Sequence, residues 1–217
     1  RFPDQLASVL DAADIACVRM ALATKDEDRL SRAADALREV AHARDVAIVI
    51  DEHVQLSERL GLDGVHLTDA ARSVAKTRKE LGKDAIVGAF CGASSHEGMT
   101  AGENGADYVA FGPVGSTTLG DGTLAEKDLF EWWSAMIAVP VVAEGALNAA
   151  IIAKLAPFTA FFGIGDEIWP SAAPVPRLQE PPPAFRPSPP VAPATPPAPT
   201  PPDTPPPSAR HRAHPPR

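Results

Sequence analysis

The sequence contains few cysteines and no long hydrophobic run. Its two cysteines, Cys17 and Cys91, lie in separate segments, which argues against a disulfide framework and fits a reducing compartment. No apolar run approaches the ~20 residues that a membrane-spanning helix requires. No signal peptide is recognisable either, although the chain begins with Arg1 rather than Met. We therefore expect a cytoplasmic protein without a membrane partner.

Basic residues are too few to attract polyanions. The chain has 20 Lys and Arg against 28 Asp and Glu, a formal net charge of -8. Beyond residue 170, five arginines face two acidic residues, so the part before it is more acidic than the whole chain. This charge argues against nucleic acid or an anionic membrane as the main partner.

Proline is rare before residue 170 and abundant after it. Only Pro3, Pro113, Pro140 and Pro157 precede that point, out of 24 prolines. Residues 1–168 have a globular composition, whereas residues 169–217 are Pro-, Ala-, Thr- and Ser-rich and cannot bury enough apolar surface to offset the entropy of ordering. We expect a disordered tail. Its runs "PPPAFRPSPP" and "PPAPTPP" favour polyproline II and docking to a proline-recognition domain, with a solvated linker as the alternative.

Within residues 1–168, short apolar runs alternate with longer helical runs. We expect strands at 15–20, 46–51, 64–67, 85–90, 107–112, 140–145 and 158–163. We expect helices at 3–13, 26–43, 54–60, 70–81, 94–104, 125–137 and 147–155. Strands that are apolar throughout are typical of parallel sheets covered by helices.

This alternation, with units of roughly 20 residues, favours an α/β fold of the β/α (TIM) barrel type. Such a barrel has eight strands, each followed by a helix. Only seven strands are expected here, and the chain opens with a helix, so the first strand is expected to be missing from this chain. A doubly wound open sheet is the alternative.

Acidic residues follow several of the expected strands. In a barrel, the loops at the carboxyl ends of the strands build the active site. Asp51, Glu52, Asp69 and Glu144 all lie at such ends. Their oxygens suit Mg²⁺, which binds one or two carboxylates together with substrate phosphate. Helix capping or simple ion pairing is the alternative for each of them.

Glycine-rich loops follow three of the expected strands, one of which also carries Glu144. The segments "EGAL" and "GIGDEI" contain Gly145, Gly163 and Gly165, and late loops of this kind commonly bind phosphate in barrels. The loop "GPVGSTTLGDG" adds the hydroxyls of Thr117 and Thr118. These loops predict a phosphorylated small molecule as ligand, with plain glycine turns as the alternative.

The segments "GLDGVHLTDA", "GADYVAFGPV" and "VPVVAEGAL" resemble thiamine phosphate synthase and its relative, the thiazole tautomerase. The resemblance extends roughly over residues 15–165, in order and at the family's spacing. It implies a β/α barrel that joins a pyrimidine pyrophosphate to a thiazole phosphate with Mg²⁺, in thiamine biosynthesis. It also implies a strand before the first helix.

The resemblance carries over three catalytic positions. Arg19 matches the arginine of the family's Gln-x-Arg-x-Lys motif, and Thr117 matches the first threonine of its Pro-Thr-x-Thr-Lys loop. Glu52 keeps the metal-binding carboxylate of the family's Asn-Asp-Arg motif. The second metal-binding aspartate of the family falls on Ala71, while Asp69 lies two residues earlier and is the metal ligand that we expect here.

Other positions depart from the family. Its metal-site asparagine is Asp51, its loop lysine is Gly120, and its Ile-Gly-Gly motif reads Glu144-Gly145-Ala146. Removing one group that stabilises a leaving pyrophosphate typically costs ~10²–10³ in rate. Two hypotheses follow: a thiamine phosphate synthase with an altered site, and a non-catalytic barrel that binds a phosphorylated small molecule or serves as a regulatory or scaffold protein. The sequence leaves a homo-oligomer open.

Overall fold

Seven parallel strands form one sheet in the computed structural model, which describes residues 2–24, 26–117, 119–169 and 175. The strands are β1 (Cys17–Met20), β2 (Ala47–Asp51), β3 (Gly64–Leu67), β4 (Ile86–Phe90), β5 (Tyr108–Phe111), β6 (Val141–Glu144) and β7 (Phe161–Gly163). They pair in chain order from β1 to β7. The order never reverses, as it would in a doubly wound sheet, so that alternative is wrong.

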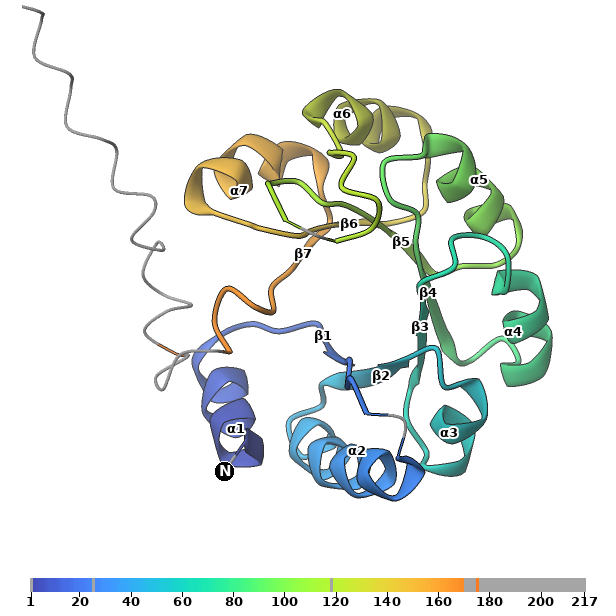
Figure 1. Ribbon diagram of the computed structural model, residues 1–217, viewed down its shortest axis with the longest axis vertical. Coiled ribbons are helices and arrows are strands. Elements are labelled where there is room, and N and C mark those ends of the chain that lie inside the picture. The colour runs from blue at the N-terminus through green and yellow to red at the C-terminus, as the bar shows by residue number, and fades with distance from the viewer. Residues whose placement is uncertain (1, 25, 118, 170–174, 176–217) are drawn as a thin grey trace, which may run out of the picture. The chain divides into compact units, whose positions relative to one another are not determined.

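One helix precedes β1 and the others connect consecutive strands, and the helices cover the outer face of the curled sheet (Figure 1). They are α1 (Phe2–Ala12), α2 (Glu27–His42), α3 (Val54–Arg59), α4 (Val74–Leu81), α5 (Ser95–Glu103), α6 (Lys127–Met136) and α7 (Ala149–Leu155). Within the described ranges, no strand joins β7 to β1, and the barrel is open there. The predicted α/β barrel-type fold is therefore confirmed as a seven-stranded, open half-barrel.

Two predicted boundaries are wrong for local reasons. The fourth helix begins at Val74 rather than residue 70, because Ala70 has a φ of 60°, which is left-handed and incompatible with an α-helix. The last strand begins at Phe161 rather than residue 158, because a 3₁₀-helix, η1 (Ala156–Phe158), precedes it. Pro157 lies in the first turn of that helix, where its fixed φ is favourable.

Polar side chains fix where several helices begin. The Asp26 carboxylate accepts hydrogen bonds from the backbone N–H groups of Asp28 and Arg29 at the start of α2. Ser94 and Asn148 cap α5 and α7 in the same way. Each cap satisfies N–H groups that have no partner inside the helix, which typically contributes about 1 kcal/mol.

The core lies between the sheet and its helices and is mostly aliphatic. An aromatic cluster fills it beside α6, where Phe111 meets both Phe130 and Trp133 edge to face. None of the helices described is long and apolar enough for a membrane span. The predicted disordered segment, residues 169–217, lies outside the described residues except for Trp169 and Val175.

Candidate active site

A row of side chains crosses the middle of the sheet at one level. The strand register places Asp51 opposite His66, His66 opposite Gly88, and Gly88 opposite Tyr108. Inward-facing side chains of a barrel stack in such layers. This layer is polar, whereas most of the surrounding core is apolar.

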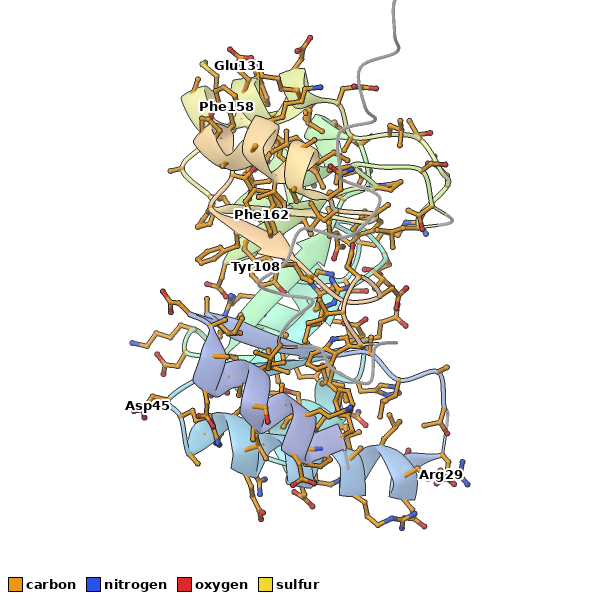
Figure 2. All side chains as sticks on the ribbon, turned by 90° about the vertical axis from the view of Figure 1, so that its left-hand side faces the viewer. Arg29, Asp45, Tyr108, Glu131, Phe158 and Phe162 are labelled. Carbon is orange, nitrogen blue, oxygen red and sulfur yellow. The ribbon has the colours of Figure 1, made fainter. Side chains whose placement is uncertain are left out.

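Gly88 gives Tyr108 room to reach across the sheet. A Cβ atom at Gly88 would lie 2.0 Å from the ring carbon Cζ of Tyr108. Because Gly88 has no Cβ atom, the tyrosine ring can stack on the His66 ring, and the Tyr108 hydroxyl lies 2.8 Å from His66 Nδ1. In the view from the open side of the barrel, Tyr108 lies between α7 above and α1 below (Figure 2).

Arg19 continues this polar row toward the last strands. Its Nη1 donates to Glu144 Oε2 at 2.7 Å and lies 3.1 Å from His66 Nε2, while its Nε lies 3.5 Å from Asp51 Oδ1. Glu144 ends β6, so the ion pair joins the first strand of the sheet to the sixth. The Arg19 guanidinium thus contacts two carboxylates and one imidazole.

Burial sets the protonation of this row. His66 is 1% exposed, and burial, helped by the Arg19 charge, lowers its pKa to about 3. Burial raises the pKa of Asp51 to about 6; Arg19 opposes the shift, and Glu144 and Glu52 add to it. Burial also raises the pKa of Glu144. His66 is therefore neutral at neutral pH, and Asp51 can exchange a proton near pH 6.

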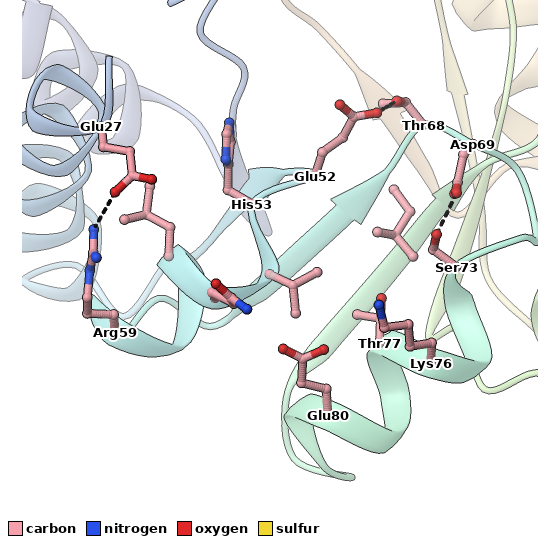
Figure 3. Close-up of a pocket in the computed structure, with 14 residues that line it drawn as sticks. Glu27, Glu52, His53, Arg59, Thr68, Asp69, Ser73, Lys76, Thr77 and Glu80 are labelled. Carbon is pink, nitrogen blue, oxygen red and sulfur yellow. Dashed lines mark hydrogen bonds and ion pairs between the residues drawn. The ribbon is translucent and has the colours of Figure 1, made fainter. Parts of the chain in front are cut away.

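The two predicted metal ligands line one cavity. A cavity of about 450 Å³ lies between α3 and α4, and its upper rim carries Glu52, Thr68 and Asp69 (Figure 3). The Thr68 hydroxyl donates to Glu52, and the Ser73 hydroxyl donates to Asp69 Oδ2 at 2.5 Å. Asp69 Oδ1 is buried and lacks a hydrogen-bond partner. Arg19 does not line this cavity.

Left-handed backbone marks the loops at this end of the barrel. Glu52, Ala70 and Ala146 have φ values of 62°, 60° and 56°, and they follow β2, β3 and β6 respectively. Such conformations are disfavoured for residues with a Cβ atom and cluster at functional sites. These left-handed residues change the direction of the chain just after strands that contribute side chains to the polar row.

The glycine loops pack on one another. Val114 and Gly115 donate their N–H groups to the carbonyl of Gly145 at 3.2 and 3.0 Å, so the loop that contains Thr117 is tied to the end of β6. Gly163 pairs with Glu144 across β6 and β7. Thr117 is exposed, and Thr118 lies outside the described residues.

The structure therefore brings the predicted site residues together in three groups. Arg19 pairs with Glu144, which also lies beside Gly163, and Glu52 and Asp69 line the same α3–α4 cavity. The glycine loops form the third group. In the described parts of the chain, no group of three or more His, Cys, Asp or Glu side chains lies close enough together to hold a metal ion.

Sequence reasoning missed two residues of this region. Tyr108 is the only tyrosine of the chain and begins a strand, but its contact with His66 depends on the strand register. Glu167 accepts hydrogen bonds from the backbone of two separate loops, at Leu147 and Gly165. The only sequence signal for Glu167 was an acidic residue two positions after the Gly-Ile-Gly loop.

Comparison with known proteins assigns a family. The sequence profile described as thiamine monophosphate synthase matches residues 1–162. The thiamine-phosphate synthase of Rhodospirillum centenum is 41% identical over 148 residues, covering 68% of this chain and 72% of that protein. That of Hyphomonas neptunium is 36% identical over 174 residues, covering 77% and 79%.

Solved structures agree on the fold. A thiamine phosphate pyrophosphorylase from Pyrococcus furiosus superposes with a TM-score of 0.73 at 18% identity, covering 82% of this chain and 85% of that chain. At this identity the likeness concerns the fold alone.

Proposed function

Because the chain belongs to the thiamine monophosphate synthase family, we propose that it forms thiamine phosphate from a pyrimidine pyrophosphate and a thiazole phosphate. Pyrophosphate is the leaving group, so the site must stabilise the negative charge that develops on its oxygen as the carbon–oxygen bond to the pyrimidine substrate breaks. The observation that carries the proposal is that Glu52 and Asp69 both lie at the rim of one cavity, after the ends of neighbouring strands.

These residues fit Mg²⁺. The ion takes one or two carboxylates and fills its remaining positions with water and phosphate oxygens. Asp69 Oδ1 is buried without a hydrogen-bond partner, so it offers a free lone pair to a cation. Glu52 is held in place by the Thr68 hydroxyl. When bound, Mg²⁺ would neutralise charge that develops on the leaving pyrophosphate.

The other groups receive roles from their positions. Arg19 would orient a phosphate oxygen at the barrel interior, although Glu144 already neutralises much of its charge. Thr117 and Thr118 would donate hydroxyls to the pyrophosphate. The backbone around Gly145, Gly163 and Gly165 would bind the phosphate of the thiazole.

A second candidate function is binding without turnover. It is favoured by the Arg19–Glu144 ion pair and by Gly120, which stands where the family has a lysine. Both features leave the site with less positive charge than a leaving pyrophosphate requires. Such a barrel would bind a phosphorylated small molecule in a regulatory or scaffold role.

The two candidates differ in one experiment. Thiazole phosphate and then the pyrimidine pyrophosphate with Mg²⁺ are titrated calorimetrically, and thiamine phosphate is assayed in the same sample. Turnover that falls at least tenfold in both Glu52→Gln and Asp69→Asn, but not in Glu80→Gln on the far side of the cavity, supports the synthase. Binding without product supports the second candidate, and neither binding nor product refutes both.

Four expectations from the sequence remain proposals. We keep the division into a barrel, residues 1–168, and a tail, residues 169–217, and we keep a proline-recognition domain as partner of the tail. The thiols of Cys17 and Cys91 are both free, which supports a reducing, cytoplasmic location. Trp132 and Met136 are exposed four residues apart on α6, which supports a homo-oligomer, testable by light scattering.

A further inference from the structure

One carboxylate occupies the amide groups of the two loops that were expected to bind phosphate. Glu167 Oε1 accepts a hydrogen bond from the backbone N–H of Leu147 at 3.0 Å. Glu167 Oε2 accepts one from the N–H of Gly165 at 2.8 Å. Leu147 follows β6 and Gly165 follows β7, so the carboxylate bridges the ends of neighbouring strands.

Helix capping explains only half of this arrangement. The N–H groups of Ile168 and Trp169 donate to the carbonyl of Gly165, which makes a helical turn, and Glu167 caps that turn through the Gly165 N–H. Capping does not require the bond to Leu147, which is 20 residues away in the chain. Two donors from separate loops therefore converge on one pair of anionic oxygens.

No ion pair compensates the charge of Glu167 in the described residues. In the part of the chain that the structure describes, no Lys or Arg forms an ion pair with it. Burial raises the pKa of Glu144, Arg19 opposes this shift, and the nearby Glu167 adds to it. The backbone amides thus hold Glu167 against repulsion from a second carboxylate. A phosphate could accept the same two hydrogen bonds.

We propose that Glu167 is a displaceable internal competitor for the phosphate group of a phosphate monoester ligand, and that it thereby sets the affinity of this site. In the free protein its carboxylate occupies the Leu147 and Gly165 amides. When the ligand binds, phosphate oxygens accept these two bonds and the half-buried Glu167 side chain turns away. The proposal rests on the proposed function, in which thiazole phosphate is the ligand at these loops.

The direct test uses inorganic phosphate as the probe. Calorimetric titration of Glu167→Ala should give a phosphate affinity at least about tenfold tighter than that of the unaltered chain, because two charge-assisted hydrogen bonds no longer have to be exchanged. Asp166→Ala is the matched control, since it removes the same charge from the neighbouring, exposed position. Its affinity should stay within about twofold of the unaltered chain.

Two results would overturn the proposal. An unchanged or weaker phosphate affinity in Glu167→Ala would mean that the carboxylate is not displaced and only holds the two loops together. An equal gain in Asp166→Ala would mean that net charge, rather than displacement, governs phosphate binding.

A measurement on the unaltered chain guards against a variant that fails to fold. In an ¹⁵N-resolved NMR titration with inorganic phosphate, the Leu147 and Gly165 amide signals should shift together and saturate at one phosphate concentration. If both signals stay in place up to high phosphate, Glu167 is not displaced and the proposal is wrong.

Turnover separates this proposal from the proposed function. If the chain is a synthase, Glu167→Ala should lower KM for thiazole phosphate and leave kcat within about twofold, because the substitution acts on ground-state binding. If no variant makes thiamine phosphate, the synthase proposal fails, and the phosphate titrations still decide the role of Glu167.

Discussion

The guanidinium of Arg19 lies 2.7 Å from the carboxylate of Glu144, although the two residues are 125 positions apart in the chain. Glu144 is 5% exposed, and the Arg19 side chain is 34% exposed. The pair therefore links a partly exposed side chain of β1 to a buried one at the end of β6.

This pair should be coupled energetically. In a double-mutant cycle of Arg19→Met and Glu144→Gln, urea unfolding should give a coupling free energy of about 1–3 kcal/mol, less than a fully buried pair because Arg19 is partly exposed. Arg19→Met alone should cost more at pH 8 than at pH 5, since it leaves a buried carboxylate without a cation. A coupling below about 0.3 kcal/mol would contradict a stabilising pair.

Asp51 should make the stability of the protein depend on pH. Its pKa is about 6 in the folded chain against an ordinary value of 3.8, so the folded state holds the proton more tightly. The stabilisation that this tighter proton binding gives the folded state is fully present below about pH 4 and is lost as the pH rises through 6. Asp51→Asn should therefore stabilise the protein at pH 8 by about 1–3 kcal/mol and have little effect at pH 4.

Urea unfolding at several pH values measures this difference. Asp14→Asn is a suitable comparison, because Asp14 is exposed. The free energy of unfolding of this variant should stay within about 0.5 kcal/mol of that of the unaltered chain at pH 4 and at pH 8. An Asp51→Asn variant that is less stable at pH 8 would show that the bond to Arg19 outweighs the burial of the charge.

The fold was predictable because burial leaves a strong pattern in the sequence. Segments such as "VAIVID" are apolar on both strand faces, and that pattern located all seven strands of the sheet. The strand ends located Asp51, Glu52, Asp69 and Glu144 at the edge where a barrel builds its site. These expectations need only the local sequence and the topology.

The contacts within the site were not predictable in the same way. The bond between Tyr108 and His66 depends on a register that puts Gly88 between them. The bonds of Glu167 to Leu147 and Gly165 depend on how two loops leave their strands. Neither register nor loop direction is encoded in a local apolar pattern.

Gly88→Ala should disrupt the polar row. The added Cβ would lie 2.0 Å from Tyr108 Cζ, so the ring must move and the Tyr108 hydroxyl must leave His66. Overpacking and an unsatisfied buried His66 nitrogen should together cost about 3 kcal/mol, measured by thermal or urea unfolding. Gly165→Ala should cost less than about 0.5 kcal/mol, because nothing lies within 4 Å of its added Cβ.

A second substitution identifies the cause of that loss. Removing the ring in Gly88→Ala/Tyr108→Ala makes space for the new methyl group. The double variant should therefore be destabilised by clearly less than the sum of the two single variants. If the losses in free energy of unfolding simply add, the Gly88→Ala variant is destabilised by something other than a clash with the Tyr108 ring.

Ala146 offers a stabilising substitution. Its φ of 56° costs a residue with a Cβ about 1–2 kcal/mol, and glycine avoids that cost while losing about 0.4–1 kcal/mol through its freer unfolded state. Ala146→Gly should therefore raise the free energy of unfolding by about 0.5–1 kcal/mol, or Tm by about 2–3 °C. Gly145→Ala, the reverse change one residue earlier, should be destabilising, because its φ is 88° and its Cβ would lie 2.8 Å from Leu119 and 2.9 Å from Pro113. If Ala146→Gly lowers Tm instead, the Ala146 methyl group contributes packing that outweighs the backbone strain.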